Sequence, residues 1–204
     1  MSKLPWPTKG DKAFSDEGAG KSFQLRNVRY WHLPQHANAF RVAAEMVIQT
    51  YVNAPRQPYH DDLVFPVVYL YRHYLELKMK DLIRLGARVG LLENETVQKS
   101  LGCHGLEQLW GHVKELLTKR WPDAEDDAPE HVESVIAEFH LTDPDGQTIR
   151  YERDRAGKRN KYENLPDLVS LSTLYETMER VSTFFDAAYD GVDAGLQDME
   201  HGGP

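Results

Sequence analysis

DDLVFPVVYLYRHYLELKMKDLIRLG, residues 61–86, is the stretch of this 204-residue chain that decides the fold. Its apolar residues recur in steps of three and four, which is the period of one face of an α-helix. A helix that is apolar over so much of its circumference is typical of the interior of a helical bundle. Two adjacent rows carry this pattern: Val64, Val68, Tyr71, Leu75, Met79, Leu82, and beside them Leu63, Val67, Leu70, Tyr74, Leu77.

The polar residues of this helix form a narrow wedge, which we expect to be open to water: Arg72, His73, Glu76, Lys80 and Arg84. In a functional interpretation, Arg72 holds a phosphate or carboxylate and His73 transfers a proton, oriented by Glu76. In a structural interpretation, Arg72–Glu76 and Glu76–Lys80 are exposed ion pairs between residues four apart, worth roughly 0.3–0.5 kcal/mol each. The sequence leaves both interpretations open.

The rest of the chain predicts more helices and few strands. Asp61 or Asp62 is expected to cap the central helix, and Gly86 and Gly90 to close it. Other helices are predicted at 40–52, at 104–119, from Asp127 onward, and from Asn164 to Gly191, with Leu168 in the core row of the last. Before that last helix, residues 143–146 (DPDG) predict a turn and residues 147–151 a short extended piece.

These elements predict an all-α, up-and-down bundle of four to five helices with a short irregular or hairpin excursion before the last helix. Pro34 is expected to interrupt any long helix before residue 40. The domain is placed at residues 23–190, between a flexible arm (1–22) and a loose acidic tail (191–204).

Composition limits the function classes. The chain is 41% apolar and 27% charged, with no stretch long enough to span a membrane and no apolar leader at its start, which favours a cytoplasmic protein. A single cysteine, Cys103, excludes an internal disulfide framework and is expected to be a small buried residue. The net charge of −8 argues against a surface that coats nucleic acid as a whole, although a local basic patch is compatible with it.

One such patch precedes the last helix. Its two tyrosines are interleaved with cations, so they can stack on bases while the cations contact phosphates. The alternatives are a solvated hairpin that balances the acidic surface, or a dimer contact. The predicted nucleic-acid-binding residues are Arg150, Tyr151, Arg153, Arg155, Lys158, Arg159, Lys161 and Tyr162.

Three segments, YLYRHYLELK (69–78), HGLEQLW (104–110) and DPDGQTIRYERDRAG (143–157), together resemble the HEPN superfamily of prokaryotic helical domains. The resemblance covers roughly residues 60–190. It implies a bundle that is commonly dimeric. Many HEPN members are metal-independent ribonucleases in toxin, defence or RNA-processing systems, and others bind or scaffold without catalysis.

Active HEPN members carry an Arg, a polar residue and, four to six residues after the Arg, a His. Arg159 and Asn160 match this motif, but Asn164 stands where the His belongs. An asparagine amide cannot exchange a proton near neutral pH as a histidine can. Arg26 and His32 satisfy the spacing literally, but they lie before the first clear helix.

A metal-dependent alternative rests on His60-Asp61, the pair used by helical phosphohydrolases, but helix capping explains Asp61 more simply. We therefore expect no metal and no cofactor. The sequence favours a binding or regulatory module associated with RNA in a defence or toxin–antitoxin setting, with a second copy of itself, RNA or an antitoxin as partners. The alternative is a metal-independent endoribonuclease that uses Arg72, His73, Glu76 and Arg159.

Overall fold

The computed structural model describes residues 33–53, 61–153, 156–158 and 164–201 of the chain. These residues form helices and loops and contain no β-strand, which confirms the all-α bundle. The described part has six α-helices and one 3-10 turn: α1 (Leu33–Asn53), η2 (Asp61–Leu63), α2 (Val64–Arg88), α3 (Asn94–Leu101), α4 (Leu106–Arg120), α5 (Ala128–Thr142) and α6 (Leu171–His201).

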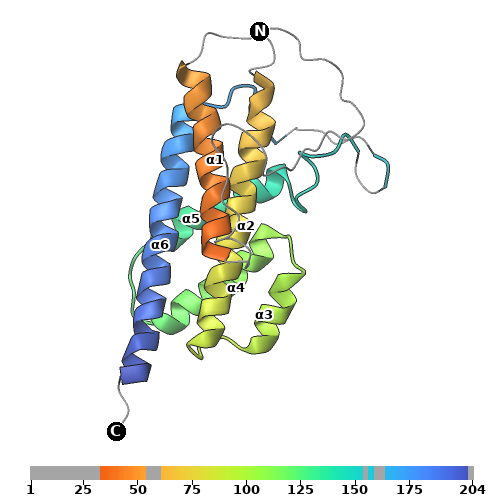
Figure 1. The fold of residues 1–204 in the computed structure, drawn as a ribbon. Helices are drawn as coiled ribbons and strands as arrows, with labels where there is room; N and C mark the ends of the chain where they lie inside the picture. The colour runs from red at the N-terminus through yellow and green to blue at the C-terminus, as the bar shows by residue number, and fades with distance from the viewer. Residues whose placement is uncertain (1–32, 54–60, 154–155, 159–163, 202–204) are drawn as a thin grey trace, which may run out of the picture. The chain divides into compact units, whose positions relative to one another are not determined.

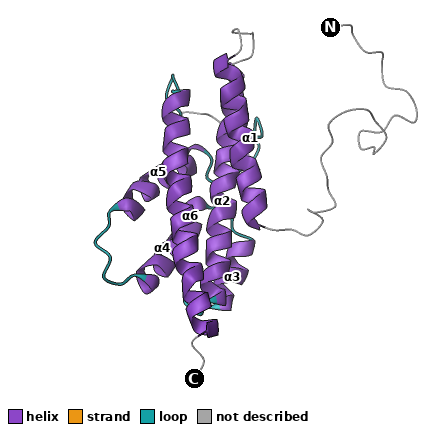
Figure 2. Ribbon diagram, turned by 60° about the vertical axis from the view of Figure 1, so that its left-hand side comes forward, coloured by secondary structure: helices purple, strands orange, loops and turns teal. Residues whose placement is uncertain are grey.

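Helix α2 is the centre of this bundle. It contacts all five other α-helices, and α1 forms its most extensive partner surface. Figure 1 shows α1 and α6 lying lengthwise along α2, with α1 antiparallel to both, while α3 and α4 lie beside the C-terminal part of α2. The same three long helices remain side by side in the rotated view of Figure 2. The stretch at 61–86 is therefore an interior helix, as its two apolar rows predict.

The burial of α2 follows the predicted rows closely. Tyr71, Tyr74, Leu75 and Met79 are fully buried. Gly86 was expected to end the helix, but it lies within α2 because helix α4 approaches it too closely for a side chain. A Cβ at this position would lie 2.8 Å from a methyl carbon of Leu116. The helix ends at Arg88, and Gly90 makes the following turn with a φ of +75°.

The helix starts differ from the predictions at several places. Helix α1 begins at Leu33 because Pro34 falls in the first turn, where its missing donor costs little. Neither Asp61 nor Asp62 caps α2: its N-cap is Leu63, without a side-chain cap bond. Helix α3 was not predicted, because its eight residues contain only two apolar side chains, Val97 and Leu101, and only Ser100 is buried.

The last helix begins and ends later than expected. Helix α6 starts at Leu171, where the Ser170 hydroxyl accepts a hydrogen bond from the Thr173 backbone N–H at 3.3 Å. Leu168, predicted to lie in the core, is 90% exposed. Gly191 does not end α6, which continues to His201. The glycine instead makes room for Trp121, whose Cζ2 would be 2.6 Å from a Cβ at this position.

One buried carboxyl on α2 opposes folding at neutral pH. Asp81 is only 8% exposed, and within the described residues its Oδ2 has no hydrogen-bond partner. Burial raises the pKa of Asp81 from 3.8 to about 6, against the opposing charges of Lys78, Arg84 and Arg88. The folded chain therefore binds this proton more tightly than the unfolded chain, and stability declines as the pH rises from about 4 to about 6.

We expect Asp81→Asn to raise the free energy of unfolding above pH 6.5 by up to about 3 kcal/mol, since one pKa unit corresponds to about 1.4 kcal/mol. At pH 3 the gain should nearly vanish, because the wild-type carboxyl is then largely protonated in both states. Urea denaturation across this pH range measures the effect, with Asp62→Asn at an exposed carboxylate as the control. Destabilisation by Asp81→Asn at pH 7.5 would contradict the assignment.

Candidate nucleic-acid interface

Arg72 lies at the centre of a buried polar network. Its side chain is 2% exposed, and each nitrogen of its guanidinium has a partner. Nε donates to the Asp143 carbonyl at 2.7 Å, and Nη2 donates to the His104 carbonyl at 2.6 Å and, at 3.5 Å, to that of Pro144. Nη1 pairs with Glu76 Oε2 at 3.1 Å. One side chain of α2 thus holds the loop before α4 and the loop after α5.

Glu76 is the carboxylate that joins Arg72 to Lys80 and His104. It is 4% exposed, and its Oε1 accepts hydrogen bonds from Lys80 Nζ and pairs with His104 Nδ1, each at 2.9 Å. Burial alone would raise the pKa of Glu76, but the hydrogen bond and charge of Lys80, together with His104, hold this pKa below its ordinary value. Both predicted ion pairs of the wedge form, but the prediction that they are open to water is wrong.

His73 lies on a different side of α2 from its sequence neighbour Arg72. Its half-buried ring meets Phe40 of α1 edge-on, with centroids 4.4 Å apart, and is parallel to Tyr69 at 6.0 Å. Burial lowers the pKa of His73, and the neighbouring cations add to this while Glu76 opposes it. Within the described residues, no hydrogen bond joins His73 to Glu76. The imidazole that Glu76 orients is that of His104.

The loop after α5 rests on Arg72. Residues 143–146 form the predicted turn, and Gly146 has a φ of +76°. Asp143 is fully buried, and its Oδ1 accepts the Thr148 N–H at 2.8 Å. Residues 147–151 were predicted to be extended, but they form a second turn, in which the N–H groups of Arg150 and Tyr151 both donate to the Gln147 carbonyl at 3.1 Å. This turn places Ile149 in the core, 8% exposed.

Arg150 joins this loop to the aromatic edge of α2. Its Nε donates to the Gly146 carbonyl at 2.6 Å. The guanidinium carbon lies over two rings, 5.3 Å from the centroid of Tyr69 and 5.5 Å from that of Tyr151. Tyr151 is 54% exposed and Arg150 is exposed. We call His73, Tyr69, Arg150 and Tyr151 the aromatic–arginine row.

The remaining predicted basic residues are only partly described. Arg153 and Lys158 are exposed, and Arg153 Nη1 donates to the Gly157 carbonyl at 3.0 Å. Asn164, which stands where the HEPN motif has its histidine, donates from Nδ2 to the Leu141 carbonyl at 2.6 Å. The other candidates lie outside the described residues: Arg26, His32, His60, Arg155, Arg159, Lys161 and Tyr162.

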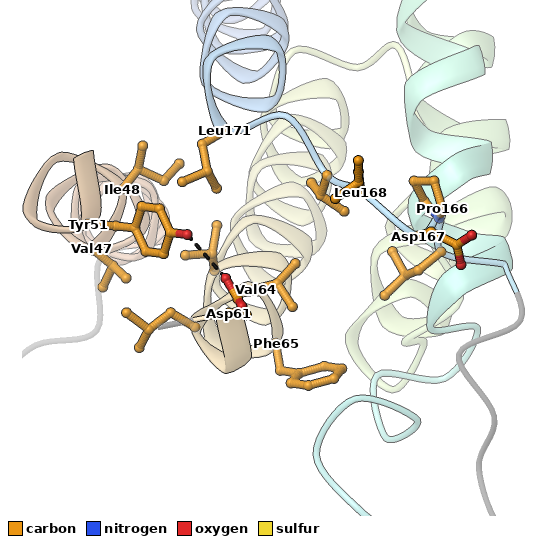
Figure 3. A pocket seen from close by; sticks show the side chains of 14 residues that line it. Val47, Ile48, Tyr51, Asp61, Val64, Phe65, Pro166, Asp167, Leu168 and Leu171 are labelled. Atoms are coloured by element: carbon orange, nitrogen blue, oxygen red, sulfur yellow. Dashed lines mark hydrogen bonds between the residues drawn. The ribbon is translucent and has the colours of Figure 1, made fainter. Parts of the chain in front are cut away.

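The structure also contains an apolar pocket of about 610 Å³. It is lined by the end of α1, the start of α2 and the segment that leads into α6. Figure 3 shows the Tyr51 hydroxyl directed at Asp61, with the hydrogen bond of 3.2 Å drawn between them. Leu171 and Val64 line the same pocket. Of the residues that line it, only Asp61 belongs to a candidate site weighed from the sequence, the metal pair with His60, so this pocket and the aromatic–arginine row are distinct.

No protein-family model, curated protein or solved structure matches this chain. The HEPN resemblance therefore stays a prediction from the sequence. Among the described residues, no cluster of three or more His, Cys, Asp or Glu side chains is arranged to bind a metal ion. No helix in the described ranges has the length and apolar character needed to cross a membrane.

We expect Glu76→Gln to lower the free energy of unfolding by about 3 kcal/mol at pH 7, because it removes the counter-charge of the buried Lys80 and leaves Arg72 with the Asp143 carboxylate alone, whose Oδ2 lies 3.4 Å from Arg72 Nε. The pKa of Glu76 is lowered on folding. The stability that this carboxylate contributes to the wild type is therefore complete above pH 4.5 and is lost as the pH falls further. Denaturant unfolding at pH 7 and pH 4 measures both effects. His104→Ala, which removes the exposed partner alone, should cost less than about 1 kcal/mol; equal losses in the two variants would contradict this network.

Proposed function

We propose that this chain is a binding module for single-stranded RNA, and that the aromatic–arginine row is where unpaired bases stack. The observation that carries the proposal is Arg150, an exposed cation over the rings of Tyr69 and Tyr151. Proteins that bind single strands combine aromatic rings, on which bases stack, with cations that contact the phosphates.

The residues around the aromatic–arginine row favour the binding of a polyanion, although the net charge of the chain is negative. Arg153 and Lys158 are exposed in the same loop as Arg150. The sequence adds Arg155 between these two residues, and Arg159 and Lys161 between Lys158 and α6. A local concentration of cations attracts a nucleic-acid backbone even where the net charge is negative, with an affinity that falls as salt rises. The setting in defence or toxin–antitoxin systems and the homodimer rest on the HEPN resemblance.

Fluorescence anisotropy with a labelled single-stranded oligoribonucleotide tests the proposal. We expect Arg150→Ala and Tyr151→Ala each to weaken binding by roughly 10-fold, because stacking on one side chain is worth about 1–3 kcal/mol per base. A duplex of the same sequence should bind more weakly than the single strand, since its bases are already stacked.

The matched control is Arg180→Ala on α6, which removes another exposed cation, 3.7 Å from Glu176. This variant should bind RNA as the wild type does. The proposal fails if the wild type shows no binding at low salt, or if Arg180→Ala weakens binding as much as Arg150→Ala.

A second candidate function is metal-independent RNA cleavage, and the observation that favours it is the His104–Glu76 pair. The His104 side chain is 60% exposed, while its Nδ1 is held by a carboxylate that is 5% exposed. A buried carboxylate on one imidazole nitrogen orients the ring and leaves the other nitrogen to exchange a proton with a substrate. In this candidate function His104, rather than the predicted His73, transfers the proton.

Incubation of labelled RNA with a chelator separates the two functions. If the second candidate holds, cleavage survives the chelator and is lost in His104→Ala, while it persists in His131→Ala, an exposed histidine on α5. Loss in His73→Ala alone would favour the site predicted from the sequence. Binding without cleavage supports the binding module and eliminates the second candidate.

A further inference from the structure

We propose that Arg72 is the positioning residue of the aromatic–arginine row. Its buried guanidinium fixes the turn at residues 143–146, and the Gly146 carbonyl of that turn fixes Arg150 over Tyr69 and Tyr151. The consequence for RNA affinity rests on the proposed binding function, but the geometry does not depend on it.

The Arg72 guanidinium has little freedom to move. It is among the largest fully buried side chains of the described residues, and it donates to three backbone carbonyls as well as to Glu76. An arginine that is held at all three guanidinium nitrogens in this way is rigid, and displacing it would leave the carbonyls and Glu76 Oε2 without their donor.

This guanidinium is in close contact with Gly146. A Cβ on Gly146 would lie 2.9 Å from Arg72 Nη1 and 3.2 Å from its Cζ. The glycine backbone thus lies directly against the guanidinium. Its φ of +76° is a conformation that other residues adopt only with strain. The turn therefore requires a glycine for two reasons, and one of them is Arg72.

Gly146 connects the buried guanidinium to the exposed aromatic–arginine row. The Gly146 carbonyl accepts the Arg150 Nε–H at 2.6 Å, and this bond holds the guanidinium over the two rings. A long exposed side chain loses rotamer freedom when it binds a ligand, so holding Arg150 in place beforehand reduces this loss. Arg72 thus acts on RNA binding through Arg150, without contacting RNA.

Two substitutions test this chain of contacts. Arg72→Lys keeps the buried positive charge but loses the fork that holds the carbonyls of Asp143, Pro144 and His104. Gly146→Ala places a methyl group against the guanidinium, so the turn must shift. The matched control is Gly90→Ala, where φ is +75° but no atom lies within 4 Å of the added Cβ. If Arg72→Lys does not fold, Gly146→Ala carries the test alone.

In the anisotropy assay we expect Arg72→Lys and Gly146→Ala each to weaken RNA binding by roughly 5- to 10-fold and Gly90→Ala to leave it unchanged. Combined with Arg150→Ala, Gly146→Ala should cause no further loss, because residues that act through one another are not additive. Losses that multiply in the double variant, or unchanged binding in both single variants, would overturn the proposal.

Nuclear magnetic resonance of the Arg150 Nε–H group tests the geometry without RNA. The two tyrosine rings should shift this resonance, and the shift should be lost in Arg72→Lys and Gly146→Ala but kept in Gly90→Ala. A resonance unchanged in all variants would overturn the positioning role even if RNA binds. If the wild type binds no RNA while the shift is lost as expected, the proposed function fails and the positioning role stands.

Discussion

The interaction on which the rest of this structure depends is the pairing of the Arg72 guanidinium with Glu76 and three backbone carbonyls inside the bundle. Moving a charge out of water costs several kcal/mol, so Arg72 is tolerated on an interior helix only if partners surround it. Glu76 lies one turn away on α2, but the three carbonyls lie 32 to 72 residues further along the chain, in the loops on either side of the α4–α5 pair. The buried charge therefore fixes where those loops lie.

Most of the fold was predictable from periodicity, and the failures have physical causes. The rows through Tyr71, Leu75 and Met79 identified α2 as an interior helix, because side-chain burial follows the helical period. The burial of Arg72 and Glu76 could not be predicted from periodicity. The loops that cover these two residues are distant in the sequence, and no local pattern encodes that contact. The prediction that Leu168 lies in the core was wrong for a different reason. Its spacing fits the core row of α6, but α6 begins only at Leu171.

The candidate site was half predictable. Arg150 and Tyr151 were recognised because cations and tyrosines alternate in their segment. Tyr69 was not recognised, because its contact with Arg150 joins residues that are far apart in the sequence. One signal was available: Tyr69 and His73 are two aromatic residues four apart on the same half-buried edge of α2. His104 entered the sequence analysis only as the first residue of the helix predicted at 104–119, and only the structure shows that it, rather than His73, pairs with Glu76.

The most direct test of this account is hydrogen exchange of the Arg72 Nε–H, with the exposed Arg180 side chain as the reference. The hydrogen bond to the Asp143 carbonyl and the 2% exposure of Arg72 predict that this proton exchanges only when the whole bundle unfolds, at the rate of the most protected amides of α2. Exchange as fast as that of Arg180 would contradict the account, because the guanidinium would then be in water and could hold neither loop.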